Sequence, residues 1–153
     1  MYETTLTVHS ILRLVVLVFV GLACLRSAQG ALTGRPWTAG DRLTALLATI
    51  ALDLQLVVGL ALHLGLSPVT KSAFSNFGAA MKDPELRNWT VEHPTMMLGA
   101  IVLAHVGAAL RKKSATDVVR HRWTALTLGA ALALVLVGMP WLGGTQPRPF
   151  VRL

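Results

Sequence analysis

The sequence predicts an all-α protein, a single four-helix transmembrane domain that spans residues 1–153. Composition supports this class, because 54% of the residues are hydrophobic and only 14% are charged. Four apolar segments also approach the length of about 20 residues that a membrane-spanning helix needs. Lipid offers peptide groups no hydrogen-bond partner, so such segments must be helical. The predicted spans cover approximately residues 8–25, 43–64, 91–110 and 123–141.

Basic residues predict the orientation of these spans. They gather in the first and third connections, at Arg26, Arg35, Arg42, Arg111, Lys112, Lys113, Arg120 and Arg122. Because connections rich in arginine and lysine stay on the cytoplasmic side, both termini and the connection 66–90 are expected outside. The net charge of +7 is thereby explained by topology, and no nucleic-acid partner is expected.

The first two spans have plain boundary signals. The first span holds the single cysteine, Cys24, which can form no internal disulfide and is expected to pack in the core. Glycines and Pro36 interrupt the chain after it, as in a loop. Asp41 can cap the second span, which follows directly.

The third and fourth spans differ in their polar content. The connection before the third span carries aromatic residues, so we expect it to fold against the outer membrane face, partly as a short helix. Thr90 is expected to cap the third span, with Glu92 at its positive end and Pro94 in its first turn. The fourth span has no ionisable residue between Trp123 and Trp141 and is expected to be a packing wall.

Histidines mark the outer ends of three spans. At a rise of about 1.5 Å per residue, His9, His63 and His93 each fall within roughly 5 Å of the outer surface. Ionisable groups in spans usually face the bundle or a cavity, so these three side chains are expected to share one layer.

Polar residues deeper in the spans also need partners. Asp53 and Gln55 can both face inward on the second span, and a long Arg13 side chain is expected to reach the Asp53 carboxylate. His105 lies too deep to share a layer with His93, and a pairing with His121 near the inner side is an alternative. Asp53, Gln55 and Glu92 are therefore expected to be buried polar residues.

Opposed histidines on facing apolar helices are a usual way to bind haem iron. The layer therefore predicts one b-type haem near the outer face, with His9 and His93 as axial ligands and His63 as the substitute. Arg13 is expected to serve a propionate or a buried carboxylate. Because no C-x-x-C-H motif occurs, the haem is expected to be held non-covalently.

The segments VHSILRLVV, DRLTALLATIALDLQLVVGLAL, MKDPELRNWTVEHPTMMLGAI and RKKSATDVVRHRW cover most of the chain. They resemble segments of small bacterial four-helix integral membrane proteins loosely labelled cytochrome b-like. The resemblance implies a multi-pass protein of the bacterial inner membrane, with a haem bound by His9 and His93. Two-haem cytochromes b carry paired histidines about thirteen or fourteen residues apart on one helix, and this chain lacks them. That difference argues against electron transfer across the membrane through two haems.

The predicted function is electron transfer within a respiratory or redox complex rather than stand-alone catalysis, with the lipid bilayer and other membrane subunits as partners. Two alternatives stay open. A periplasmic-side copper-binding module is one, because histidine and methionine are ligands that copper accepts. The available side chains are His93, Met96, Met97, Met81 and Met139. A cofactor-free accessory subunit of a larger membrane complex is the other.

Overall fold

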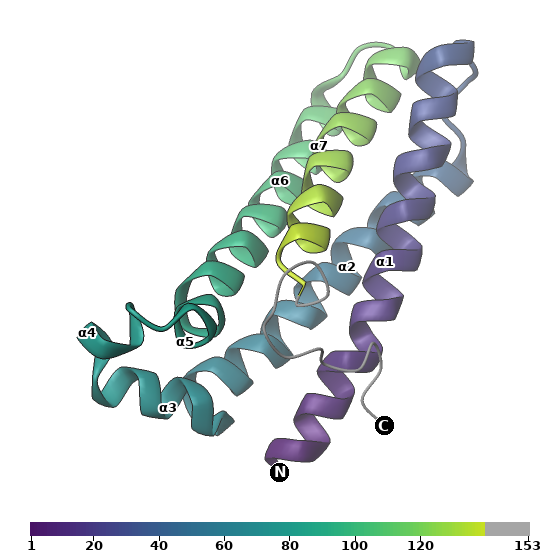
Figure 1. Ribbon diagram of the computed structural model, residues 1–153. Coiled ribbons are helices and arrows are strands. Elements are labelled where there is room, and N and C mark those ends of the chain that lie inside the picture. The colour runs from purple at the N-terminus through teal and green to yellow at the C-terminus, as the bar shows by residue number, and fades with distance from the viewer. Residues whose placement is uncertain (140–153) are drawn as a thin grey trace.

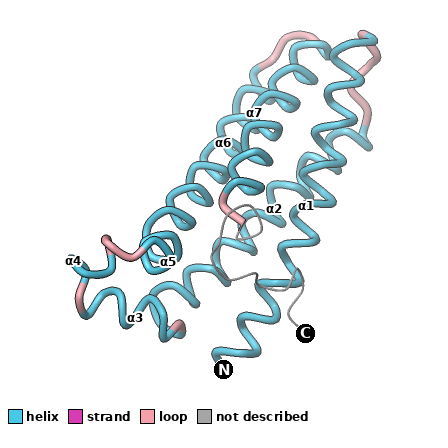
Figure 2. Tube along the Cα trace, viewed as in Figure 1, coloured by secondary structure: helices cyan, strands magenta, loops and turns pink. Residues whose placement is uncertain are grey.

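The computed structural model describes residues 1–139, which form helices joined by short connections (Figures 1 and 2). No strand occurs within these residues, so the all-α class holds for them. The elements are α1 (Tyr2–Thr33), α2 (Ala39–Ala61), a π-helical turn η1 (Leu62–Leu66), α3 (Pro68–Ser75), α4 (Phe77–Ala80), α5 (Pro84–Arg87), a second π-helical turn η2 (Asn88–Glu92), α6 (His93–Lys113) and α7 (Asp117–Val137).

Three continuous helical stretches are long and apolar enough to cross a membrane, namely Tyr2–Thr33, Ala39–Leu66 and Pro84–Lys113. Each contains one predicted span and extends beyond it at both ends. Hydropathy marks only the apolar middle of a helix, whereas capping residues and polar end turns decide where the helix stops. The fourth predicted span overlaps α7, and its last residues, including Trp141, lie outside the described part of the chain.

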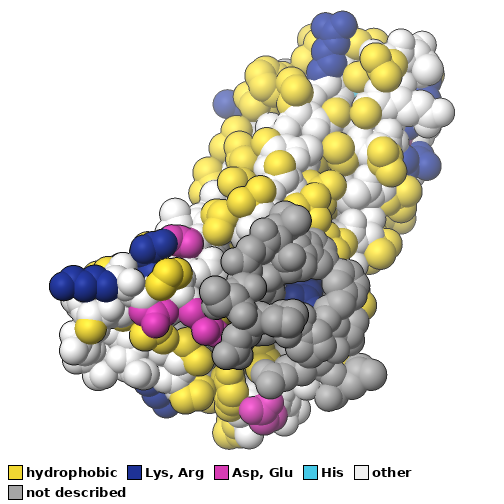
Figure 3. Space-filling model, in the orientation of Figure 1, with side chains coloured by type: hydrophobic (Ala, Val, Ile, Leu, Met, Phe, Trp, Pro, Cys, Tyr) yellow, Lys and Arg dark blue, Asp and Glu magenta, His cyan; other side chains and the backbone are white. Residues whose placement is uncertain are grey.

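The long helices pack in the order α2, α1, α7, α6. α1 contacts both α2 and α7, and α7 contacts α6, whereas α2 and α6 form the weakest of the four contacts between neighbouring long helices. The N-terminus and the short helices α3 to α5 lie at one end of the molecule, and the α1–α2 and α6–α7 connections lie at the other (Figure 1). On the face in view, hydrophobic side chains dominate the stretch between the two ends (Figure 3).

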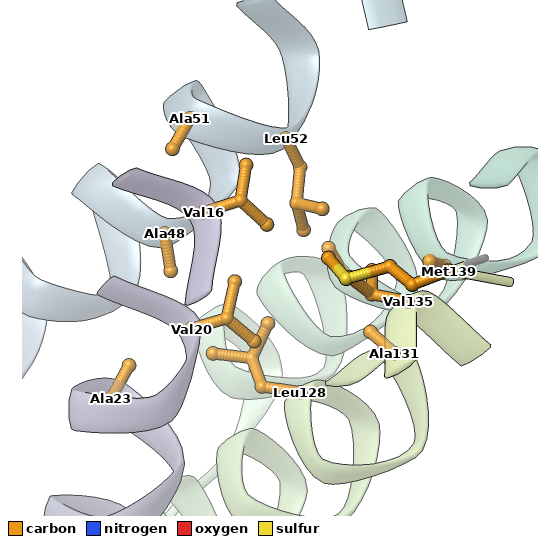
Figure 4. Close-up of a cluster of buried hydrophobic side chains, with 12 residues drawn as sticks. Val16, Val20, Ala23, Ala48, Ala51, Leu52, Leu128, Ala131, Val135 and Met139 are labelled. Carbon is orange, nitrogen blue, oxygen red and sulfur yellow. The ribbon is translucent and has the colours of Figure 1, made fainter. Parts of the chain in front are cut away.

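The core combines small residues with a few branched ones. Val16 and Val20 of α1 pack against Leu52 of α2 and against Leu128 and Val135 of α7 (Figure 4). Alanines fill the remaining positions and let the helix backbones approach closely. They are Ala23, Ala48, Ala51, Ala100, Ala104 and Ala131.

Two glycines mark the closest helix contacts. A methyl group added at Gly30 of α1 would collide with the His121 ring of α7. One added at Gly107 of α6 would lie 2.8 Å from Thr127 Cβ of α7. Both contacts exist only because the side chain is a hydrogen atom, so α7 is held tightly between α1 and α6.

A buried carboxylate joins α1 to α2 at the end of the bundle away from the N-terminus. Asp41 accepts hydrogen bonds from Arg35 Nη1 at 2.7 Å and Nη2 at 2.6 Å, and from Arg26 Nε at 3.2 Å. The hydrogen bond to the Asp41 carboxylate raises the pKa of Arg35 above its usual range. Thr38 is the N-cap of α2, and Asp41 completes a capping box with it. Asp41 therefore acts at the third helical position rather than as the cap itself.

The predicted cap of the third helix is wrong. Thr90 does not cap this helix, because the helical stretch already begins at Pro84 with Asp83 as its N-cap. It passes through the π-helical turn η2, in which the His93 N–H donates to the Asn88 carbonyl. Pro94 has no N–H for the next α-helical bond, and the wider turn before it accommodates that loss. The connection before it does contain short helices, as predicted.

We predict that Gly30→Ala lowers the free energy of unfolding by about 2 kcal/mol, because the added methyl overpacks the α1–α7 contact against a rigid imidazole. Thermal unfolding in detergent, followed by circular dichroism, measures the change. Gly21→Ala on the same helix is the control, since a Cβ there meets nothing within 4 Å. Equal stability of the two variants would contradict the contact.

We predict that Asp41→Ala lowers the free energy of unfolding by about 2 kcal/mol, the order expected when a buried partner of charged hydrogen bonds is removed. The same unfolding experiment applies. The neighbouring Arg42 is exposed, so Arg42→Ala is the control and should leave stability nearly unchanged. A loss no larger than that of the control would show that the Asp41 cluster does not join the helices.

Candidate functional site

A cavity of about 580 Å³ lies near the N-terminal end of α1, between α1, α2 and α6. It occupies the gap left where α2 and α6 diverge. Its walls are largely apolar, and its polar lining comes from several elements. The aromatic and polar side chains that matter most are His9, Arg13, Gln55, His63, Trp89 and His93. A cavity of this size is within the range that small-molecule and cofactor sites occupy.

His93 is the most firmly positioned of the histidines. Its Nδ1 lies 2.8 Å from the carbonyl oxygen of Gly138 at the end of α7. Since a carbonyl can only accept, Nδ1 carries the proton and Nε2 keeps a lone pair. The Trp89 ring packs beside the imidazole at a centroid distance of 5.6 Å. The Gly138 contact thus orients His93 and, in the neutral ring, leaves the Nε2 lone pair available.

His9 lies across the cavity from α6. Its ring centroid is 6.4 Å from that of His93, and the two planes meet at 74°. Gln55 Nε2 lies 3.3 Å from His9 Nε2 and also donates to the His9 carbonyl oxygen at 3.1 Å. His9 Nδ1 and Gln55 Oε1 are buried without a hydrogen-bond partner among the described residues. The His9 side therefore has unused polar capacity next to the cavity.

His63 completes the predicted layer. It lies in the π-helical turn η1, and its ring packs edge-on against Phe74 of α3 at 5.5 Å. The side chain lines the same cavity as His9 and His93. The structure thus brings the three histidines of three helices to one site, as their depth along the spans predicts.

Arg13 lines the cavity, but the predicted Arg13–Asp53 contact is wrong. Arg13 Nη2 donates to Ser10 Oγ at 3.2 Å, and Asp53 Oδ1 instead lies 2.9 Å from His105 Nε2. The helical phase explains the difference. Asp53 and Gln55 are two residues apart and therefore point about 200° apart around α2. Gln55 faces α1 and the cavity, so Asp53 faces away, towards α6.

Two residues expected to be buried are not. The Asp53 side chain is 44% exposed, and the Glu92 side chain is also about half-exposed. Glu92 Oε1 accepts a hydrogen bond from Arg87 Nε at 2.6 Å at the rim of the molecule. Of the three residues predicted as buried polar groups, Gln55 alone lines the cavity.

The alternative pairing of His105 with His121 is also wrong. His105 pairs with Asp53, while His121 is fully buried near the opposite end, against Gly30 and 4.8 Å from the Trp37 ring. Within residues 1–139, no group of three or more histidine, cysteine, aspartate or glutamate side chains lies close enough to hold a metal ion.

Sequence reasoning missed two contributors to the site. Trp89 precedes His93 by four residues, the spacing that places two side chains on one helical face, so this signal was present. The sequence gives no sign that the Gly138 carbonyl contacts His93, because every residue carries the same backbone oxygen. Only the packing of α7 against α6 brings it to His93.

No protein-family model, curated protein or solved structure matches this chain. The function must therefore be argued from the cavity and its side chains.

Proposed function

We propose that this chain is a four-helix transmembrane protein of the bacterial inner membrane that binds one b-type haem in the outer cavity and transfers electrons within a larger redox complex. The observation that carries the proposal is the pair of imidazoles, His9 and His93, on two helices beside one cavity of about 580 Å³.

The spacing of the two rings fits a shared metal ion. Histidine nitrogens bind metal ions at about 2 Å, so two imidazoles on opposite sides of one ion have centroids roughly 6 Å apart. The observed separation is 6.4 Å. His93 offers the Nε2 lone pair, and His9 has a buried nitrogen without a partner among the described residues. The donor set therefore fits the two axial positions of a haem.

The surrounding residues supply the rest of a haem site. The Gly138 carbonyl fixes the His93 tautomer and makes the imidazole a stronger donor, as outer-shell partners of metal-bound histidines do. Arg13 lies one helical turn from His9 and suits a propionate carboxylate. Val16, Leu52 and Ile101 are among the apolar residues that would exclude water from the macrocycle. A bound haem supplies one-electron redox chemistry, which no side chain of this cavity provides alone.

The transmembrane arrangement is supported by three stretches of sufficient length and apolarity. It is further supported by the gathering of basic connections at the end opposite the N-terminus. In the proposed topology these connections are cytoplasmic, and both termini and the cavity are on the outer side.

A copper site is the second candidate. Met97 and Met139 line the same cavity as His93, and thioether and imidazole ligands together suit copper. The two candidates use the same space, so they are exclusive. A chain that binds neither would be an accessory subunit that acts only by contact with other subunits.

We predict that His93→Ala and His9→Ala each lose the low-spin haem spectrum of the purified protein, because each removes an axial ligand. Arg42→Ala, which is exposed and outside the cavity, is the control and should keep the spectrum. Absorption spectra of the reduced protein, after membrane insertion has been checked, measure the effect. Full haem occupancy with an unchanged low-spin spectrum in both alanine variants would refute the ligand pair.

Other outcomes of this experiment separate the alternatives. Loss of the spectrum in His63→Ala alone would move the site to η1. Copper found by elemental analysis in a haem-free protein would support the copper site, and the absence of both would favour the accessory subunit.

We predict that a reporter active only outside the cytoplasm is active when fused after Leu153. A reporter that works only in the cytoplasm should be active when it is inserted after Gly34, in the first basic connection. Enzyme activity of the two fusions in whole cells measures the orientation. A carboxyl-terminal reporter that works only in the cytoplasm would contradict the topology.

A further inference from the structure

One polar pair lies on the outside of the helix packing. Asp53 Oδ1 of α2 is 2.9 Å from His105 Nε2 of α6, and the two side chains are 44% and 55% exposed. Asp53 lies at the middle of the candidate span Ala39–Leu66. Its neighbours on the same helical face, Ile50 and Val57, are exposed and apolar, as is Val102 beside His105. The pair is thus a polar spot in an apolar surface at mid-membrane depth.

Such a spot is costly if it faces hydrocarbon. Ionisable groups in a span usually face protein or water, and polar atoms in lipid have no solvent partner. Asp53 and His105 form their described hydrogen bond with each other alone. Asp53 Oδ2 and His105 Nδ1 remain as one further acceptor site and one further ring nitrogen. Lipid cannot satisfy them, so the pair favours a polar partner on this face.

We infer that a second copy of this chain docks on the α2–α6 face, so that the Asp53–His105 pairs of the two copies close a ring of hydrogen bonds. The inference rests on the transmembrane placement proposed above. It does not depend on the haem.

The pair is self-complementary. With one proton between Oδ1 and Nε2 and one on Nδ1, the pair is neutral overall and presents one donor, Nδ1–H, and one acceptor, Oδ2. Each copy can therefore donate to the Asp53 of its partner and accept from the partner's His105. All polar atoms of both pairs are then satisfied without any other molecule.

Membrane symmetry makes a second copy the natural occupant. Two copies with the same orientation are related by an axis along the membrane normal, which maps every residue onto its own depth. When the axis passes beside the α2–α6 face, the pair of one copy meets the pair of the other. The flanking Ile50, Val57 and Val102 supply the apolar part of the contact, and a single polar position within an apolar helix surface fixes register and partner number.

The test is cysteine cross-linking in native membranes, in a Cys24→Ala background that removes the single natural thiol. Val102→Cys places a thiol beside His105 on the proposed face, where the native side chain is 59% exposed. Val18→Cys on α1 is the matched control, since Val18 is 63% exposed on a different helix. The expected result is an oxidant-dependent dimer of the Val102→Cys chain, with little for Val18→Cys. Equal cross-linking of both, none for Val102→Cys, or cross-linking of Val102→Cys only to another protein would overturn the inference.

A second measurement tests the ring of hydrogen bonds directly. Single-molecule photobleaching counts the labelled chains in each complex in a lipid bilayer, and the parent protein should bleach in two steps. The double variant Asp53→Leu/His105→Leu should dimerise roughly tenfold more weakly, the order expected for losing several interhelical hydrogen bonds in a membrane. Undiminished dimerisation would refute the ring.

Carbonate extraction separates this inference from the proposed topology. A chain released from the membrane by carbonate would refute the transmembrane placement and the dimer together. A chain that stays in the membrane as a monomer would refute the dimer alone.

Discussion

A hydrocarbon layer gives polar groups no partner, and this constraint orders the proposed transmembrane structure. Polar side chains gather at three levels, each with its own partners. Asp41 is enclosed by arginines at one end, and Asp53 pairs with His105 halfway along. His9, His63 and His93 line the cavity at the other end. Between these levels the core consists mainly of alanine, valine and leucine, with some buried polar contacts such as that of Thr127 with Gly107.

The order of the helices explains why two of these levels are functional candidates. α7 packs closely against α1 at Gly30 and against α6 at Gly107, because a side chain at either glycine would keep α7 at a distance. α2 packs mainly on α1 and α6 mainly on α7, and the contact between α2 and α6 is the weakest among neighbouring helices. Because α2 and α6 diverge, the cavity with the three histidines lies between them at one end. The exposed Asp53–His105 pair lies between the same two helices farther along. The α1–α7 and α6–α7 contacts are the tight ones, and both candidate sites lie along the weaker α2–α6 contact.

The sequence predicts the helices well, because apolar length is a strong signal that lipid makes unambiguous. It also brings the three outer histidines together correctly, since depth follows directly from residue number along a helix. Rotation around the helix axis is harder to predict. Asp53 and Gln55 were expected on one inner face, but residues two apart on an α-helix point about 200° apart. That α6 supplies the partner of Asp53 follows only from the packing.

Other features could not be predicted from local sequence. The helix leading into α6 starts well before its apolar part, because Asp83 caps it and a π-helical turn carries it through to His93. The partner of His93 is a backbone carbonyl of α7, which becomes visible only once α6 and α7 are packed. Exposure of the Asp53–His105 pair likewise depends on how α2 and α6 diverge rather than on either helix alone.

We propose that the cavity between α1, α2 and α6 holds one b-type haem between His9 and His93. The haem content of the parent protein, purified from cells with sufficient haem and assayed as the pyridine haemochrome, is the most direct measurement. We expect one haem b per chain, released without cleavage of a covalent bond. A folded, membrane-integrated chain that carries no haem would contradict it.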